Sequence, residues 1–365
     1  MHKLKIGISI GDINGIGLEV ILKALSHRGI VDRCILVIYG SSKVVSYHKN
    51  IVGVDFHFQT INKIEQANDK KVNVLNCWQD NINITLGKAS EESGQYAWQS
   101  LEAATTDLVA KKLDALVTAP FSKEAMNLAA FPHPGHTEYL TEKLGSAESL
   151  MFMVNDDLRI GVATNHIALK EVASSLTKSL IVKKIRLMHH SLKMDFGIER
   201  PTIAVLGLNP HASDNGVFGK EEEEIIRPAV VECKKKGVMA MGPFPADGFF
   251  GSTQFSKFDG ILAMYHDQGL VPFKLLSFGK GVNFTAGLSA VRTSPDHGTA
   301  FDLAGKNMAD PSSFLQSLFQ ALDIAQSRRD HEDMHANALV KREQKTEDVL
   351  AGQEDIPDET SNKGN

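Results

Sequence analysis

The chain has 365 residues, of which 42% are hydrophobic and 23% charged, a composition typical of folded globular proteins. This length exceeds what one compact core usually supports, so we expect two lobes or domains. The formal net charge of -5 excludes the strongly basic surface of nucleic-acid or anionic-membrane binders, and an anionic ligand would need a local basic pocket.

The three cysteines, Cys34, Cys77 and Cys233, lack paired spacing. A disulfide scaffold or a cysteine-based zinc site is therefore not expected. The chain has no apolar run long enough to span a membrane and no leader-like segment after Met1, so we expect a soluble, cytoplasmic protein.

Short apolar runs alternate with amphipathic stretches along most of the chain. Strands are predicted at residues 5–10, 35–39, 113–118, 150–154, 158–163, 203–208 and 260–265. Helices are predicted at residues 18–25, 179–194 and 222–236, and a serine pair at 41–42 is expected to cap another. This alternation predicts an α/β protein with a largely parallel sheet.

The first loop and the last segment limit the possible functions. Residues 11–17 read G-x-x-x-G-x-G, which is neither the dinucleotide-binding G-x-G-x-x-G nor a phosphate-binding P-loop, so the loop predicts a strand-to-helix turn and not a Rossmann fold. Residues 330–365 are highly charged and contain no Phe, Tyr or Trp, which predicts a mobile tail that carries no chemistry.

Three histidines follow predicted strands directly: His166, His211 and His266. Ligands of α/β proteins gather at the carboxyl ends of parallel strands, and imidazole is a common zinc ligand. The three residues therefore indicate a catalytic metal site. The alternative is that they are unrelated surface or capping histidines, because they are not close in sequence.

Two further polar segments could bind an anion. Gly135-His136-Thr137-Glu138 offers a flexible backbone and hydrogen-bond donors, although Thr137 could simply cap a helix. Residues 274–292 bring together the cationic and amide donors Lys274, Lys280, Asn283 and Arg292, which suit phosphate or carboxylate but could equally be solvated surface groups. Residues 297–300, His-Gly-Thr-Ala, are expected to open a helix against a nucleotide.

Taken together, these segments resemble the 4-hydroxythreonine-4-phosphate dehydrogenase family of pyridoxal 5′-phosphate biosynthesis. The matching blocks run in the family's order from residue 7 to about 315: 11–17, 118–120 with Lys123, 135–138, 164–166, 207–212, 245–247, 263–270 with Lys274, and 281–283 through 292–294 to 296–300. The last block is also similar to one in isocitrate and isopropylmalate dehydrogenases. That likeness implies a two-lobed α/β/α fold with a non-Rossmann NAD site and an obligate homodimer.

The resemblance implies a lobe division and a set of roles. Residues 1–128 with 283–328 would form the cofactor lobe, and 129–282 the metal, substrate and dimerisation lobe. His166, His211 and His266 would bind a divalent metal shared between subunits, most often zinc, with magnesium, cobalt or manganese as alternatives. The positions that match substrate-binding residues of the family are His136, Thr137, Lys274, Asn283 and Arg292.

The remaining assignments concern the cofactor and proton transfer. His297, Gly298, Thr299 and Ala300 would lie beside the adenosine half of NAD or NADP. Asp247 and Asp267 are candidates for the proton acceptor or for orienting the histidines, and Lys123 for a proton relay. Asp267 adjoins His266, where orienting that ring is at least as good an explanation as general base catalysis.

The resemblance implies oxidation of 4-phosphooxy-L-threonine at C3 and then decarboxylation to 3-amino-2-oxopropyl phosphate. Departures from the family pattern, such as Ile13, Leu18, Gly248 and Ser289, remove none of these residues. They leave 4-phospho-D-threonate or 4-phospho-D-erythronate as alternative substrates. An acyl-phosphate acyltransferase and a non-catalytic phosphometabolite-binding protein are the alternatives from other classes.

Overall fold

The computed structural model describes residues 3–55, 57–80 and 82–336. One sheet contains twelve strands in the order β3-β4-β2-β1-β5-β12-β11-β6-β7-β10-β8-β9. The strands are β1 Lys5–Ser9, β2 Ile35–Gly40, β3 Phe58–Ile61, β4 Val72–Asn76, β5 Ala115–Thr118, β6 Leu150–Val154, β7 Arg159–Val162, β8 Thr202–Leu206, β9 Met239–Phe244, β10 Gly260–Ala263, β11 Val282–Ala286 and β12 Val291–Pro295.

Twelve α-helices connect or cover these strands within the described part of the chain. They are α1 Gly17–Leu25, α2 Arg28–Val31, α3 Ser42–Val52, α4 Glu91–Val109, α5 Lys123–Leu128, α6 His136–Lys143, α7 Leu169–Ser175, α8 Lys178–Met194, α9 Arg227–Lys235, α10 Ala246–Phe250, α11 His266–Ser277 and α12 Ser312–His335. The seven predicted strands and the helices predicted at 18–25 and 179–194 are confirmed, and the α/β fold class with them.

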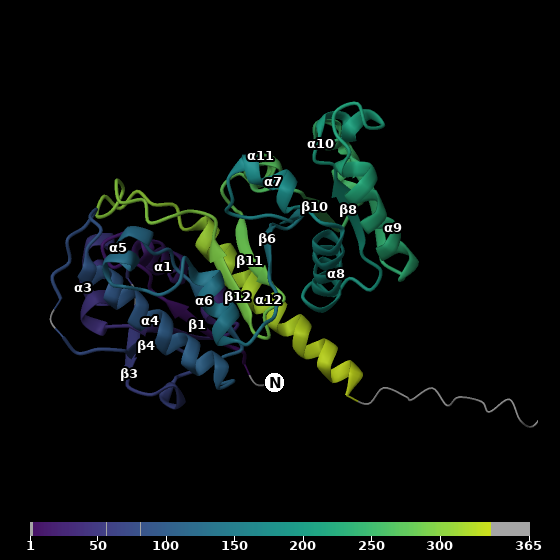
Figure 1. Cartoon of the computed structure of the whole chain (residues 1–365). Helices are drawn as coiled ribbons and strands as arrows, with labels where there is room; N and C mark the ends of the chain where they lie inside the picture. Colours follow the sequence, from purple (N-terminus) through teal and green to yellow (C-terminus); the bar gives the residue numbers. More distant parts are fainter. Residues whose placement is uncertain (1–2, 56, 81, 337–365) are drawn as a thin grey trace, which may run out of the picture.

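The sheet has two parallel halves that run in opposite directions. The strands from β3 to β12 are parallel to one another, and so are β7, β10, β8 and β9. Between the halves, β11 is antiparallel to both β12 and β6, and β6 is antiparallel to β7. Figure 1 shows the first half on one side of the molecule and β8 to β10 on the other, joined by β6, β11 and β12.

Helices pack on both faces of the sheet, which gives three layers. Alternate residues of β2 belong to different core clusters: Leu36 and Ile38 pack with the side of α1 and α3, whereas Val37 and Tyr39 pack with the side of α4. This alternation follows from the two-residue period of a strand. In the second half, α8 and α9 cover one face and α10 and α11 the other. Helix α6 packs on α4. It follows soon after residue 129, where the second lobe was expected to begin.

Three local expectations need correction. The helix expected at 222–236 is a π-helix at Glu222–Ile226 followed by α9. Ser41 stands at the start of α3, but its side chain makes no capping bond; Asn76 Oδ1 accepts the Ser42 N–H at 2.8 Å instead. Helix α6 begins at His136 after Gly135, so Thr137 is not its cap.

The last helix also differs from expectation. Because α12 extends to His335, residues 330–335 belong to it, while residues 337–365 of the expected tail lie outside the described residues. Within the described part of the chain, no helix is both long and apolar enough to span a membrane.

Candidate functional site

A cavity of about 440 Å³ lies where the two halves of the sheet meet. Its lining comes from the ends of β5, β7 and β12, the start of β11, and helices α5 and α6. The lining residues that the sequence singled out are Lys123, His136, Thr137, His166, Asn283, Arg292, His297 and Gly298. Residues that are far apart in the sequence, between 118 and 298, therefore line one cavity.

Arg292 is the cation at the inner wall of this cavity, and its side chain is 3% exposed. Its Nε and Nη2 atoms donate to Thr118 Oγ1 at 3.1 and 2.6 Å, and Nη1 donates to Thr285 Oγ1 at 3.2 Å. Burial lowers the pKa of Arg292 to about 10, and no described carboxylate forms an ion pair with it. A buried guanidinium held only by hydroxyls is suited to pair with an anion.

His136 forms another wall and is uncharged at neutral pH. Its ring stacks on Phe121, with 3.9 Å between the ring centroids. Burial, and then the positive charge of Arg292, lower the pKa of His136 well below its usual value. A neutral imidazole beside Arg292 can donate one hydrogen bond to an anion without adding charge to the site.

His166 and His266 lie together at the exits of β7 and β10, with 5.4 Å between their ring centroids. A second cavity of about 490 Å³ contains both, and it shares Asn165 and His166 with the first cavity. Burial lowers the pKa of His166, and the charges of Lys123 and His266 lower it further. These effects favour the neutral form of the ring, which is the form of imidazole that binds a metal.

His211 follows β8, the neighbour of β10, but its ring contacts Phe218 rather than the other two histidines. Among the residues described, no three His, Cys, Asp or Glu side chains are grouped closely enough to share an ion. All residues from His211 to Asn215 have positive φ, between 46° and 71°. Such a run of non-glycine residues is strained, which is common at functional sites.

Hydrogen bonds tie together the three strand exits that carry these histidines. Thr164, after β7, donates its hydroxyl to the Met264 carbonyl after β10, at 2.7 Å. Gln268, on α11, accepts from Met264 N–H at 2.7 Å and donates to the Gly207 carbonyl after β8 at 2.6 Å. The fully buried Glu222 accepts the N–H groups of Leu208 and Asn209, each at 2.7 Å.

The other predicted site residues are more scattered. Asp267 Oδ1 lies 2.7 Å from His266 Nδ1, a geometry that orients the ring and leaves Nε2 available. Lys274, on α11, donates to the Asp296 carbonyl at 3.3 Å but does not line the cavity. Asp247 lies on α10, exposed and away from both cavities.

The first loop and the loop after β12 pack against each other. The Ile16 N–H donates to the Thr299 carbonyl at 3.0 Å, and a Cβ on Gly15 would come within 2.9 Å of that oxygen, so Gly15 permits the close approach. His297 Nδ1 lies 3.0 Å from the Gly298 carbonyl, which makes it the donor. His297 Nε2 is then a buried acceptor that lacks a partner.

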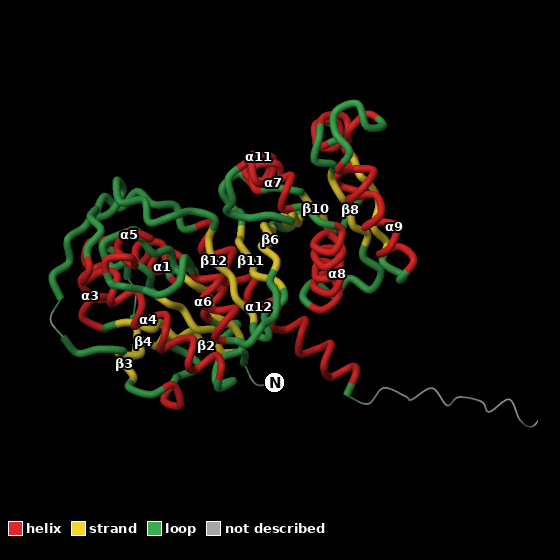
Figure 2. The backbone as a smooth tube through the Cα atoms, viewed as in Figure 1, coloured by secondary structure: helices red, strands yellow, loops and turns green. Residues whose placement is uncertain are grey.

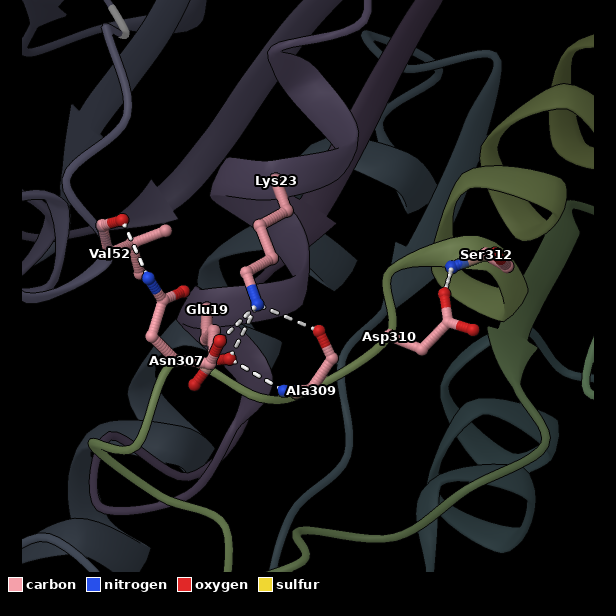
Figure 3. A network of polar contacts seen from close by, with 7 residues as sticks. All are labelled: Glu19, Lys23, Val52, Asn307, Ala309, Asp310 and Ser312. Atoms are coloured by element: carbon pink, nitrogen blue, oxygen red, sulfur yellow. Dashed lines mark hydrogen bonds and ion pairs between the residues drawn. The ribbon is translucent and has the colours of Figure 1, made fainter.

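Residues 297–300 do not open a helix, contrary to expectation. They begin a long loop of turns that reaches α12, drawn as a continuous green tube in Figure 2. Figure 3 shows how α1 fixes its far end: Lys23 Nζ donates to the Ala309 carbonyl at 2.9 Å and pairs with Glu19 at 2.8 Å, while Glu19 accepts the Ala309 N–H. Asn307 donates to the carbonyl of Val52, the last residue of α3.

His48 on α3 supports the first loop and should make stability depend on pH. Its side chain is 3% exposed, and Nε2 lies 2.9 Å from the Ile13 carbonyl. Burial lowers the pKa of His48 to about 4, so the folded protein keeps this ring neutral while the unfolded chain protonates it below about pH 6.5. Its contribution to the free energy of unfolding is thus present above that pH, and about 2 kcal/mol should be lost as pH falls towards 4.5.

Urea unfolding at pH 7 and pH 5 measures this effect. The His48→Gln variant should lose less stability between the two pH values than the parent, whereas the matched change at the exposed His27 should leave the loss unaltered. Equal losses of stability in the parent and in His48→Gln would show that this pH dependence does not come from His48.

Several important residues escaped sequence reasoning. Phe121, Thr285 and Glu222 were given no role, because each acts through a partner on a different segment of the fold. Asn165 was given none either, because only the folded chain shows that it lines the cavity. The blocks that match the family include Gly207, Asn209 and Gln268, but they assigned no role to these residues. For Glu222 the sequence offers only the charged run 221–224. Nothing in that run distinguishes the buried Glu222 from the other three glutamates.

Known proteins are similar to this chain over most of its length. A curated relative from Bacteroides thetaiotaomicron, named 4-hydroxythreonine-4-phosphate dehydrogenase, is 46% identical over 93% of this chain and 94% of its own length. A relative from Cupriavidus necator, named D-threonate 4-phosphate dehydrogenase, is 38% identical over 88% of this chain and 98% of its own.

Solved structures give the same result. The crystal structure of 4-hydroxythreonine-4-phosphate dehydrogenase from Klebsiella pneumoniae superposes with a TM-score of 0.80 and 34% identity, covering 89% of this chain and 99% of that one. Residues 32–321 match the family described as Pyridoxal phosphate biosynthetic protein PdxA. The match spans most of the chain, which confirms the resemblance: the protein belongs to the pyridoxal phosphate biosynthetic PdxA family.

Proposed function

We propose that this protein is an NAD(P)- and metal-dependent dehydrogenase that oxidises 4-phosphooxy-L-threonine at C3 in pyridoxal 5′-phosphate biosynthesis. The observation that carries the proposal is the buried Arg292, which opens into a cavity adjoining the His166–His266 pair. The cavity thus offers an anion clamp on one side and two imidazole rings on the other. The names of the relatives support this substrate class.

The residues present suit a divalent ion, most often zinc in such sites. His166 and His266 would be two ligands, with Asp267 orienting the second ring, and His211 would be the third. Bound there, the ion would favour ionisation of the C3 hydroxyl and then polarise the resulting ketone, which aids loss of carbon dioxide.

The chain's own residues would position the substrate for this chemistry. Arg292, with Asn283 and the neutral His136 beside it, would hold a charged end and fix C3 relative to the nicotinamide. Lys123, which lines the same cavity as His166, would relay the C3 proton. Asp267 would orient the His266 ring. Asp247 lies away from both cavities, so it would not reach the site within one chain.

The nicotinamide nucleotide would bind where the loop after β12 meets the first loop. His297 Nε2, a buried acceptor without a partner on a residue that lines the cavity, suits an N–H or O–H donor of the nucleotide. The choice between NAD and NADP stays open, and a cytoplasmic location stays a prediction.

A homodimer would complete the site. Large apolar side chains are exposed on the elements next to the three histidines: Leu169 on α7, Val217 and Phe218 after His211, and Val271 and Leu275 on α11. Exposed apolar surface of this extent marks an interface. A second copy of the chain packed there would bring further ligands to the His166–His266 pair, which has no third His, Cys, Asp or Glu grouped with it among the described residues.

Two alternatives differ in what they require. Oxidation of D-threonate 4-phosphate is favoured by the relative that carries that name and would use the same clamp and histidines. An acyl-phosphate acyltransferase or a non-catalytic binding protein would need neither the histidine pair nor the buried acceptor at His297.

The test is reduction of NAD or NADP, followed by absorbance, with 4-phosphooxy-L-threonine, 4-phospho-D-threonate and 4-phospho-D-erythronate in parallel. Each assay is run after chelation and again after a divalent metal is restored. Preference for the threonine compound, lost on chelation and regained with metal, is the expected result. Preference for an aldonate would move the protein to sugar-acid metabolism, and absence of turnover with all three would contradict the proposal.

A further inference from the structure

Glu138 is the one carboxylate among the described residues that line the Arg292 cavity. It lies on the first turn of α6, one residue after Thr137, and its Oε2 atom folds back over Gly135. A Cβ on Gly135 would lie 3.0 Å from that oxygen, so the glycine leaves room for the carboxylate.

The charge of Glu138 acts on both functional sides of the cavity. It raises the pKa of Arg292, against the larger lowering by burial. It also opposes the lowering of the pKa of His166 by burial, Lys123 and His266. Glu138 therefore lines the same cavity as Arg292 and His166 and forms an ion pair with neither.

A carboxylate is a poor neighbour for an anionic ligand. It would repel the phosphate and carboxylate that Arg292 and Lys123 attract, unless the ligand also carries a positive group to meet it. Asn165, which lines the same cavity, adds a second acceptor, because its Oδ1 atom is buried and lacks a hydrogen-bond partner. The cavity thus contains acceptors for a cationic donor as well as donors for an anion.

We propose that Glu138, assisted by Asn165, recognises the ammonium group on C2 of the substrate and thereby selects an amino acid phosphate over a hydroxy acid phosphate. This inference rests on the proposed function and deepens it. In 4-phosphooxy-L-threonine the ammonium lies on the carbon next to the C3 hydroxyl, between the two ends of the molecule. D-Threonate 4-phosphate carries a hydroxyl at C2, which leaves the charge of Glu138 uncompensated.

The experiment compares kcat/KM for the two compounds in the metal-loaded parent enzyme, in Glu138→Gln and in the control Glu142→Gln. Glu142 lies one turn further along α6 and outside the cavity. Glu138→Gln should lower kcat/KM for 4-phosphooxy-L-threonine by about 10- to 100-fold, since a charge-assisted bond becomes a neutral one. The value for D-threonate 4-phosphate should stay level or rise, and Glu142→Gln should match the parent with both.

Calorimetric affinities of the same proteins for both compounds, measured without nucleotide, provide a readout independent of turnover and should show the same change in ratio. An equal fall for both compounds in Glu138→Gln, or an unchanged ratio, would overturn the selection role while the parent still oxidises the threonine compound. A parent enzyme that oxidises neither compound, or prefers the aldonate, would instead contradict the proposed function itself.

Discussion

Replacing Arg292 with alanine is expected to lower kcat/KM for the phosphorylated substrate by about a thousandfold, the usual size of losing a buried, charge-assisted anion contact. The guanidinium is 3% exposed and is held by the hydroxyls of Thr118 and Thr285, so its direction is fixed before any ligand binds. Because an ordered donor costs little to immobilise on binding, most of its attraction is available to the substrate.

Arg292→Lys separates charge from geometry. Lysine keeps the positive charge but cannot bond Thr118 and Thr285 at once, so a loss of about 10- to 100-fold is expected. Steady-state kinetics with 4-phosphooxy-L-threonine and with 4-hydroxy-L-threonine, which lacks the phosphate, would show which charged end Arg292 holds. Thermal unfolding of each variant checks the fold. Activity within about threefold of the parent in folded Arg292→Ala would show that the clamp lies elsewhere.

Replacing His211 with asparagine should abolish metal-dependent turnover and leave the protein folded. Asparagine is well tolerated at positive φ, so the left-handed segment from His211 to Asn215 is retained while an imidazole ligand is lost. A loss of metal affinity of at least about a hundredfold is expected.

Metal content after dialysis and NAD reduction before and after adding zinc measure this loss directly. The same change at the exposed His27 provides the control and should alter neither quantity. Full activity in a metal-stripped His211→Asn protein would remove His211 from the ligand set and the metal from the reaction.

The sequence predicted those strands whose residues are apolar on both faces. β2, for example, has all six residues buried between two helical layers and reads as an unbroken apolar run. It did not predict β12, because Arg292, Thr293 and Ser294 are polar residues that the fold buries. Without β11 and β12, the two antiparallel pairings at the centre of the sheet could not be foreseen.

Prediction of the site had a similar limit. The exits of strands indicated His166 and His266 correctly as neighbours, because β7 and β10 are adjacent and parallel. The bond from Arg292 to Thr118, however, joins residues 174 positions apart, and such contacts depend on strand order rather than on local pattern. The same holds for Gln268 and the Gly207 carbonyl.

The continuous sheet restricts how its two halves can move around the candidate site. β12, β11 and β6 are adjacent hydrogen-bonded strands, and together they form the connection between the halves. A bend at a flexible linker is therefore not the available motion, since it would break these ladders. The halves can rotate against each other by a change in sheet twist, which strands accommodate over many small dihedral adjustments. Closure around the substrate would then be a small elastic deformation of the whole sheet, reversible without local unfolding.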